Sequence, residues 1–451
     1  MDCMSPVPDA LVVFMRYPEP GLVKSRLAAA VGREEACRIY QKLVRCTLGV
    51  AADFQAQMPD VHVWIYFTPE DKKHLLEQSY PGPWRFAPQR GTHLGERMGH
   101  SVQEMLHRGY RHVLIVGTDL ADLRPGDFEE AFTALERGYA VLGPATDGGF
   151  YFIGLDRPCP SAFSPETWGT SEVFARTGQL LRSEGLAVRI LGMKRDIDRP
   201  EDIREMEKNP IFRARLSVII PTLRPIEELR QRLLIPLQYR LWPDDEIIVV
   251  RGLDSGRQEE ARELCPGVFV IGSPVGRGIQ LNAGARMARG DVFLFLHDDC
   301  MPPPNAFHAA RRIVLMPNKS LGCFQLSFSP TSRTMDLIAR WANIRTRLFK
   351  LPYGDQGLFC RRQIFDSLGG FKKAYLMEDV DFVQRSRKLG GLLIRADKIL
   401  ASPHRYLNRG ILRASMLNHT IMLLHHLGVD DRKLHSLYYG TKNVKTPHAK
   451  A

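Results

Sequence analysis

Short runs of apolar residues recur along the chain, and longer segments of mixed apolar and charged residues separate them. Residues 11–15 (LVVFM) and 216–221 (LSVIIP) are two such runs, and a loop and a helix-like segment follow each. Later runs at 113–116 (VLIV) and 292–296 (VFLFL) repeat this order within each half. Near-continuous apolar runs are typical of strands covered on both faces of a parallel sheet. The pattern therefore predicts two tandem α/β domains, each a mostly parallel sheet flanked by helices.

A charged segment, 201–215 (EDIREMEKNPIFRAR), separates the two halves. Its first part is expected to be helical, and Asn209 and Pro210 interrupt it just before the first strand of the second half. We therefore expect one domain over residues 1–208 and another over residues 209–440. The end of the chain, 441–451, is expected to be a flexible tail.

Composition and charge favour a soluble enzyme with phosphate-bearing ligands. Lys and Arg number 62 against 50 Asp and Glu, a formal net charge of +12. Such an excess favours nucleotides, nucleic acid or anionic lipid as partners. The basic residues are spread along the chain rather than clustered, so no nucleic-acid partner is expected.

The cysteines and the hydropathy of the chain indicate in which cell compartment the protein is expected. The eight cysteines form no C-x-x-C pair, which argues against a disulfide framework or a structural zinc site. No apolar run approaches the ~18 residues that span a membrane. These features predict a cytoplasmic protein with at most a peripheral membrane contact. The basic, Trp-bearing segment 335–354 is the candidate for that contact, and the alternative we favour is an amphipathic helix that covers the site.

Acidic residues directly follow two of the predicted strands. Asp298 and Asp299 follow the run at 292–296, and Asp119 follows the run at 113–116. In open α/β sheets ligands bind beyond the carboxyl ends of the strands, so acids there are placed for chemistry. Carboxylate oxygens are typical ligands of Mg²⁺. A lone aspartate at such a place is also a common turn or helix-start residue.

The C-terminal half resembles the family 2 glycosyltransferases of the GT-A fold over about residues 215–430. The resemblance rests on an ordered set of motifs: SVIIPT, EIIVV, GRGIQLNAGARMARGDVFLFLHDD, GDQG, LGGF and MEDVDFVQR. It implies a metal-dependent, inverting glycosyltransferase of the hexosyltransferase type, with a nucleotide-sugar donor and an unidentified acceptor. By this resemblance Asp299, helped by Asp298 or His297, holds Mg²⁺ or Mn²⁺ on the donor diphosphate.

The same resemblance implies that Asp379 is the catalytic base, with Glu378 as a nearer acid or an orienting neighbour. Acids that complement a helix dipole are the alternative for both residues. Where relatives carry an acid after the second strand, this chain has Arg251, and Asp254 is the possible substitute. The residues expected to contact the donor are Pro221, Arg277, Asn282, Asp254, Asp355 and Gln356.

Three segments of the N-terminal half carry candidate chemistry of their own. The loop PEPGLVKSRL places Lys24 and Arg26 beside a glycine, as in a phosphate cradle or a basic helix start. The segment ATDGG offers Asp147 and two glycines, Gly148 and Gly149, that allow close approach of the backbone. The segment DIDRPEDI places Asp196 and Asp198 before a capped helix.

With LGERM, GTDLADL and WGTSEV, these segments resemble nucleotidyltransferase-like GT-A domains over about residues 8–205. The specific resemblance is to predicted transferases related to molybdenum-cofactor and phospholactate guanylyltransferases. It implies that Lys24 and Arg26 contact a nucleoside triphosphate and that Asp119 and Asp198 bind the metal. It further implies that 147–149 line the substrate pocket, while Gly95 and Arg97 frame the nucleotide.

Together the two halves predict a bifunctional enzyme. One domain handles a nucleotide-activated group and the other transfers a sugar, and fusion raises their effective concentration. Two alternatives remain open at this point: both domains are glycosyltransferases, or the N-terminal domain is a non-catalytic nucleotide-binding module.

Overall fold

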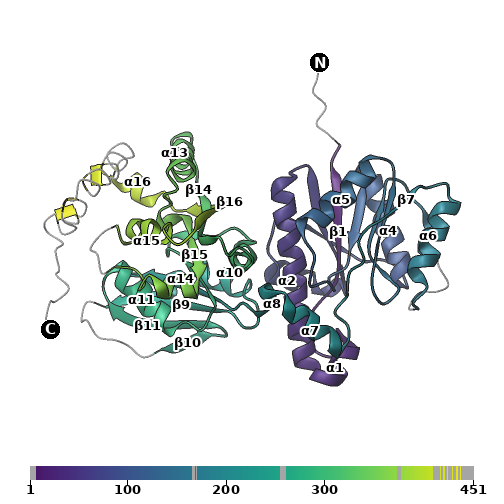
Figure 1. Ribbon diagram of the computed structural model, residues 1–451, viewed down its shortest axis with the longest axis horizontal. Helices are drawn as coiled ribbons and strands as arrows, with labels where there is room; N and C mark the ends of the chain where they lie inside the picture. Colours follow the sequence, from purple (N-terminus) through teal and green to yellow (C-terminus); the bar gives the residue numbers. More distant parts are fainter. Residues whose placement is uncertain are drawn as a thin grey trace, which may run out of the picture. The chain divides into compact units, whose positions relative to one another are not determined.

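The computed structural model describes residues 7–164, 168, 170–253, 261–372 and 377–409, and residues 417, 420, 421, 424, 429, 433, 434 and 437 (Figure 1). The chain divides into two compact units, Met1–Arg213 and Ala214–Ala451. The predicted boundary at 208/209 lies between the last two helices of the first unit. The predicted tail, 441–451, lies outside the described residues. No helix of the described part of the chain is long and apolar enough to cross a membrane.

The first unit is built on a seven-stranded sheet with the order β3-β2-β1-β4-β6-β5-β7. Strand β1 runs parallel to both of its neighbours, and β6 is antiparallel to β4 and β5. The strands are β1 (Asp9–Arg16), β2 (Val61–Thr68), β3 (Arg85–Pro88), β4 (Val113–Val116), β5 (Ala140–Pro144), β6 (Phe150–Leu155) and β7 (Val188–Ile190).

Helices cover the sheet of the first unit because its central strands are apolar on both faces (Figure 1). Helix α2 packs against α5, where Phe54 stacks on Phe132. Helix α4 contributes Met98 and Val102 to a cluster that includes Val12 of β1. The helices are α1 (Ser25–Val31), α2 (Arg33–Gln57), α3 (Lys73–Ser79), α4 (Leu94–His107), α5 (Pro125–Glu136), α6 (Val173–Ser183), α7 (Pro200–Lys208) and α8 (Pro210–Arg213).

The second unit is built on a nine-stranded sheet with the order β10-β11-β9-β8-β12-β15-β14-β16-β13. The run β11-β9-β8-β12 is parallel, and β15 pairs antiparallel with β12. The strands are β8 (Leu216–Thr222), β9 (Glu246–Leu253), β10 (Arg262–Cys265), β11 (Val268–Pro274), β12 (Val292–Phe295), β13 (Cys300–Met301), β14 (Lys319–Phe328), β15 (Leu358–Arg361) and β16 (Gly391–Ala401).

Two apolar clusters flank this second sheet, as alternate side chains of each strand point to opposite faces. Leu294 belongs to one cluster, and Phe293 and Phe295 belong to the other. The helices are α9 (Ile226–Leu229), α10 (Ile235–Gln238), α11 (Arg277–Met287), α12 (Ala306–Arg311), α13 (Arg333–Phe349), α14 (Arg362–Ser367), α15 (Glu378–Ser386) and α16 (His404–Arg409). The predicted fold class, two tandem α/β units of GT-A type with largely parallel sheets, is thus confirmed.

Helix α13 has one buried and one exposed face. Its buried residues are Met335, Ala339, Ala342 and Thr346. Its outward face carries Leu337, Trp341 and Leu348, which are exposed. Most of this helix lies in segment 335–354, for which an amphipathic helix is the favoured prediction and a peripheral membrane contact the alternative; its buried and exposed faces make it amphipathic.

Candidate functional site

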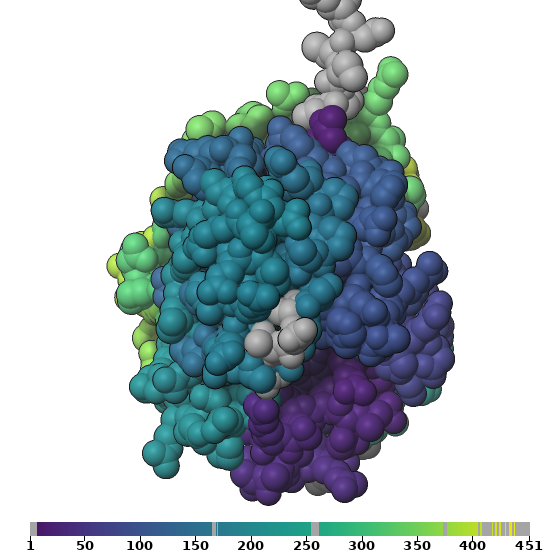
Figure 2. Space-filling view, turned by 90° about the vertical axis from the view of Figure 1, so that its right-hand side faces the viewer, coloured from purple at the N-terminus to yellow at the C-terminus, as the bar shows by residue number. Residues whose placement is uncertain are grey.

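The first unit has a cavity of about 1020 Å³ at the carboxyl ends of its central strands. The residues that line it come from segments far apart in the sequence. On the surface of this unit, segments from its beginning and its end lie side by side, as the purple and teal areas of Figure 2 show. The lining comes from the end of β1, the start of α1 and the loop before it, the residues after β4 and β5, the start of β6, the segment before α6 and the residues before α7. It includes Phe14, Arg16, Lys24, Arg26, Gly117, Asp119, Asp147, Gly149, Phe150, Trp168, Asp196 and Asp198. This is the place where open α/β sheets bind ligands.

Backbone contacts explain why these segments meet. The N–H of Ile197 donates to the carbonyl of Asp119, and Leu120 forms a β-bridge with Asp196. A second bridge joins Ala145 to Lys194. The residues before α7 are therefore fastened to the ends of two strands, and their acids enter the cavity beside those that follow β4 and β5.

Lys24 lies among the acids of this cavity. Its Nζ is 2.6 Å from Oδ1 of Asp119 and 3.9 Å from Oδ1 of Asp198, and its side chain is only 7% exposed. Its backbone is left-handed, with φ of 50°, a conformation that bulky residues adopt rarely. Arg26 pairs with the other oxygen of Asp198 at 3.0 Å. The four residues predicted as triphosphate and metal contacts thus form one ion-paired cluster.

Asp196 also lines this cavity, although the sequence pattern assigned it no role there. Burial raises the pKa of its carboxyl, and the nearby carboxylate of Asp147 raises it further. The signal was present in the sequence, since Asp196 and Asp198 alternate in an extended segment. Only the fastening of this segment to the loop after β4 shows that both acids reach the cavity.

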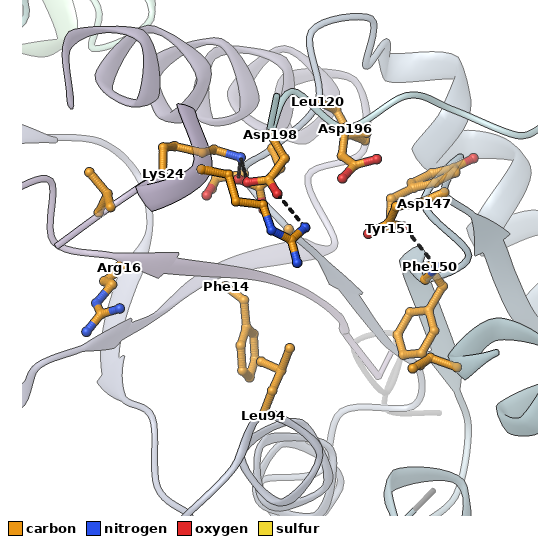
Figure 3. Close-up of a pocket in the computed structure, with 18 of the residues that line it drawn as sticks. Phe14, Arg16, Lys24, Leu94, Leu120, Asp147, Phe150, Tyr151, Asp196 and Asp198 are labelled. Atoms are coloured by element: carbon orange, nitrogen blue, oxygen red, sulfur yellow. Dashed lines mark hydrogen bonds and ion pairs between the residues drawn. The ribbon is translucent and has the colours of Figure 1, made fainter. Parts of the chain in front are cut away.

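Apolar and aromatic side chains also line the cavity, among further polar ones such as Arg16 (Figure 3). Phe14 and Leu94 lie together on one side, away from Lys24, Asp196 and Asp198. Phe150 stands against the ring of Trp168 at a centroid distance of 6.1 Å. A charged end and an aromatic end suit a ligand with both a phosphate group and a flat ring, because bases stack on aromatic side chains.

The other predicted residues of this unit have mixed placements. Asp147 and Gly149 line the cavity, and the side chain of Asp147 accepts a hydrogen bond from the N–H of Gly149 at 2.8 Å. Gly148 has φ of 91°, and a Cβ there would stand 2.2 Å from the carbonyl oxygen of Ser171. Gly95 packs against Phe163 and Trp168, and Arg97 donates to the carbonyl of Gly91. Neither Gly95 nor Arg97 is among the residues that line the cavity.

In the second unit, a tight turn follows β12 at the predicted metal site. The N–H of Cys300 donates to the carbonyl of His297 at 3.1 Å, which closes a β-turn over 297–300. One donor atom each of His297, Asp299 and Cys300 lies within 4.8 Å of the others. This is the only group of three such residues suited to one cation in the described part of the chain. The cluster of Lys24, Asp119 and Asp198 in the first unit forms no such group.

Asp298, the other predicted ligand, is directed elsewhere. Thr222, at the end of the neighbouring strand β8, donates to its Oδ2 at 2.6 Å. Arg224 lies 3.5 Å from the same oxygen. Burial raises the pKa of Asp298, and the adjacent charge of Asp299 adds to this effect. Asp298 is therefore held by β8, and it does not belong to the possible cation site of His297, Asp299 and Cys300.

Asp379 is held at the start of α15, close to this turn. Its Oδ2 accepts from the N–H of Gly354 at 2.7 Å, and its Oδ1 accepts from the N–H of Val380 at 2.8 Å. A Cβ on Gly354 would stand 2.6 Å from Nε2 of His297 and 3.2 Å from Oδ2 of Asp379. The predicted base and His297 of the 297–300 turn therefore face the same glycine.

Glu378 differs from its neighbour in both burial and partner. Its side chain is 5% exposed and lies 3.5 Å from Nη1 of Arg277, which begins α11. Burial raises the pKa of Glu378, against the lowering effect of Arg277. Asp379 is the more exposed of the two acids, and Glu378 holds the guanidinium of Arg277 in place.

Of the remaining residues predicted to contact the sugar donor, some are used by the fold to fix its backbone and others are not. The side chain of Asn282 bonds both backbone groups of Phe371, and Gln356 is fully buried, with bonds to Thr346, Tyr353 and Phe324. Pro221 lies within β8 and is buried, and Asp355 is half-buried beside Cys300. Asp254 lies outside the described residues.

Two family models match parts of the chain, one in each half. Residues 217–356 match the family model of glycosyl transferase family 2, which confirms the resemblance of the C-terminal half. Residues 51–170 match DUF2064, described as an uncharacterized protein conserved in bacteria. The finer relation of this half to molybdenum-cofactor and phospholactate guanylyltransferases stays a prediction. No curated protein matches the chain.

Among solved structures, a Desulfovibrio desulfuricans G20 protein, provisionally named a nucleotide-diphospho-sugar transferase, shares 30% identity with the chain. The match covers 51% of this chain and 97% of that protein, with a TM-score of 0.42. A second match is the mannosyltransferase PcManGT from Pyrobaculum calidifontis, solved with GDP-Man and Mn²⁺. It is 17% identical, the match covers 50% of this chain and 69% of that protein, and the TM-score is 0.36. The chain therefore belongs to the same family as the Desulfovibrio protein over about half of its length, with matches to the DUF2064 model at 51–170 and to the glycosyl transferase family 2 model at 217–356.

Proposed function

We propose that the C-terminal unit is an inverting glycosyltransferase that uses a nucleotide-diphosphate sugar. The observation that carries this proposal is the position of Asp379 and the 297–300 turn on either side of Gly354. In a single displacement, the base lies on one face of the donor sugar, and the cation that holds the diphosphate lies on the other. The two groups must therefore be about the width of one sugar apart, and this arrangement supplies both.

Asp379 is the group that accepts the proton. Its two oxygens are oriented by backbone N–H groups, so the carboxylate is fixed before the acceptor arrives. It takes the proton of the acceptor hydroxyl while that oxygen bonds to the anomeric carbon. The bond to the nucleoside diphosphate breaks at the same time, and its electron pair leaves with the diphosphate.

The turn after β12 and the start of α11 serve the leaving group. The donor atoms of His297, Asp299 and Cys300 fit one divalent cation, which when bound would neutralise the charge that develops on the diphosphate. Arg277 is placed by Glu378 to offer a guanidinium to phosphate oxygens. Glu378 thus acts as a positioning residue.

The test is nucleoside diphosphate release by the full chain, with Asp379→Asn as the variant. We expect a loss of about 10²–10⁴-fold in kcat, with the KM for the donor little changed, because only the proton acceptor is removed. Asp366→Asn, an exposed acid on α14, is the matched control. Full activity of a folded Asp379→Asn protein would exclude this residue as the base.

We propose in addition that the N-terminal unit binds a nucleotide and acts as a nucleotidyltransferase-like transferase. The supporting observation is the cavity that joins the Lys24 and Arg26 cluster to the aromatic side chains of Phe14, Phe150 and Trp168. Phosphorus NMR of the chain with nucleoside triphosphates and sugar phosphates tests this role. New pyrophosphate supports it, and binding without turnover would favour a non-catalytic nucleotide-binding module.

A further inference from the structure

The donor atoms at the turn after β12 are chemically mixed. His297 offers an imidazole nitrogen, Asp299 a carboxylate oxygen and Cys300 a thiol sulfur. Mg²⁺ prefers oxygen ligands in octahedral geometry. Nitrogen and sulfur ligands favour Zn²⁺ and its neighbours in the first transition series. The side chains at this turn therefore differ from the all-oxygen set that the pair Asp298 and Asp299 would have provided.

Two contacts hold the sulfur of Cys300 on the side of the turn where the carboxylate of Asp299 lies. Sγ of Cys300 lies 3.4 Å from Oδ1 of Asp299 and 3.7 Å from the carbonyl oxygen of Asp355. Backbone pairing of Cys300 with Ala401 in β16, and the N–H of Ser402 on the carbonyl of Asp299, hold the turn from its other side. The three donors are therefore preorganised on backbone that is anchored at both ends.

From this geometry we infer that His297, Asp299 and Cys300 form a three-ligand site that binds Zn²⁺ or Co²⁺ through the Cys300 sulfur, in preference to Mg²⁺. Three protein ligands leave one position of a tetrahedral site open, as in catalytic zinc sites. When the buried sulfur binds the cation, its thiol proton passes to the part-exposed carboxylate of Asp299, to which Cys300 already donates, and from there to solvent. This inference rests on the proposed function of the C-terminal unit, whose diphosphate leaving group would take the open position.

The experiment uses the full chain, freed of metal by a chelator and titrated with Co²⁺ as the probe. We expect a near-ultraviolet thiolate-to-cobalt charge-transfer band that Zn²⁺ abolishes at stoichiometric amounts and that excess Mg²⁺ leaves in place. Cys300→Ser should remove the band and weaken Zn²⁺ binding by about tenfold or more. Cys265→Ser, a thiol of the same unit that bonds Gln238, should keep both.

Zinc K-edge absorption of the unmodified chain gives a second measurement, which holds even if Cys300→Ser fails to fold. A sulfur neighbour at about 2.3 Å is expected. Co²⁺ bound without a thiolate band, a band that persists in Cys300→Ser, or zinc without a sulfur neighbour would each overturn the inference. Nucleoside diphosphate release is assayed in parallel. Release with Mg²⁺ and no band refutes this site alone, and a band without release under any metal refutes the proposed function alone.

Discussion

Gly354 and Asp379 are joined by a hydrogen bond of 2.7 Å, from the backbone N–H of the glycine to Oδ2 of the carboxylate. The glycine belongs to the loop before β15, and the acid begins α15. The bond fixes one oxygen of the proposed base, while the missing side chain of the glycine leaves room for His297. One residue therefore serves both the base and the cation site.

The first prediction tests this double role. Gly354→Ala should lower kcat/KM for the nucleotide sugar by about tenfold or more, because a Cβ would stand 2.6 Å from His297 and must displace it or the carboxylate. Such overpacking typically costs about 1–3 kcal/mol of unfolding free energy. Steady-state kinetics and denaturant unfolding measure the two effects. Gly126→Ala is the control, since a Cβ there meets no atom within 4 Å, and equal kinetics of the two variants would contradict the assignment.

The second prediction concerns the independence of the two sites. Asp299→Ala should abolish nucleoside diphosphate release from nucleotide sugars and leave any triphosphate-dependent reaction intact, and Asp119→Ala should do the reverse. The reason is that each acid follows a strand of a different unit. Phosphorus NMR separates the products of the two reactions. Loss of both activities in either folded variant would sink the two-site interpretation.

The third prediction concerns the ammonium of Lys24. Lys24→Met should tighten Mn²⁺ binding to the N-terminal unit, because Asp119 and Asp198 lose the cation that now lies between them. The affinity for a nucleoside triphosphate should fall by about tenfold, since a charge-assisted contact is lost. Electron paramagnetic resonance of free Mn²⁺ and calorimetry measure the two affinities. Lys73→Met, an exposed lysine of α3, should change neither, and an unchanged Mn²⁺ affinity in Lys24→Met would contradict the prediction.

The fourth prediction follows from the raised pKa of Asp196. A carboxyl whose folded pKa lies above its unfolded value contributes stability below the unfolded pKa, and this stability is lost as the pH rises through the folded pKa. Asp196→Asn removes the titration, so the variant should be slightly more stable than the parent at pH 7; the gain should be small because the carboxyl is only part-buried.

The stabilisation by Asp196→Asn should shrink as the pH falls through the raised folded pKa of Asp196, and it should be gone below the ordinary pKa of an aspartate. Thermal unfolding at several pH values measures it. Reaction or nucleotide binding in the first unit should decline in the same variant, because the cavity loses a carboxylate. A variant that is less stable than the parent at pH 7 would show that Asp196 is stabilised as the anion.

Much of this protein could be predicted from local patterns. Buried strands need apolar residues on both faces, so the runs at 11–15 and 216–221 identify the first strands of two sheets, which β1 and β8 contain. Strand ends in such sheets meet at one edge, so the acids Asp119 and Asp299 mark the two sites before any coordinates are known. The sequence by itself thus determined the α/β class and the order of the two units, and it predicted where each proposed site lies.

Only the tertiary structure decided which side chains meet at those edges. Asp298 and Asp299 are equivalent in sequence, but Thr222 of the neighbouring strand takes up Asp298, and the turn brings His297 and Cys300 to Asp299. Asn282 and Gln356 carry polar groups suited to a ligand, and the fold uses both to fix backbone. Asp196 joins the N-terminal cavity through a bridge to Leu120, far from it along the chain. The physical reason is that the position of a residue along its strand determines only which face of the sheet its side chain points to. The partner it meets depends on which strand lies alongside, and strand order is a property of the whole sheet.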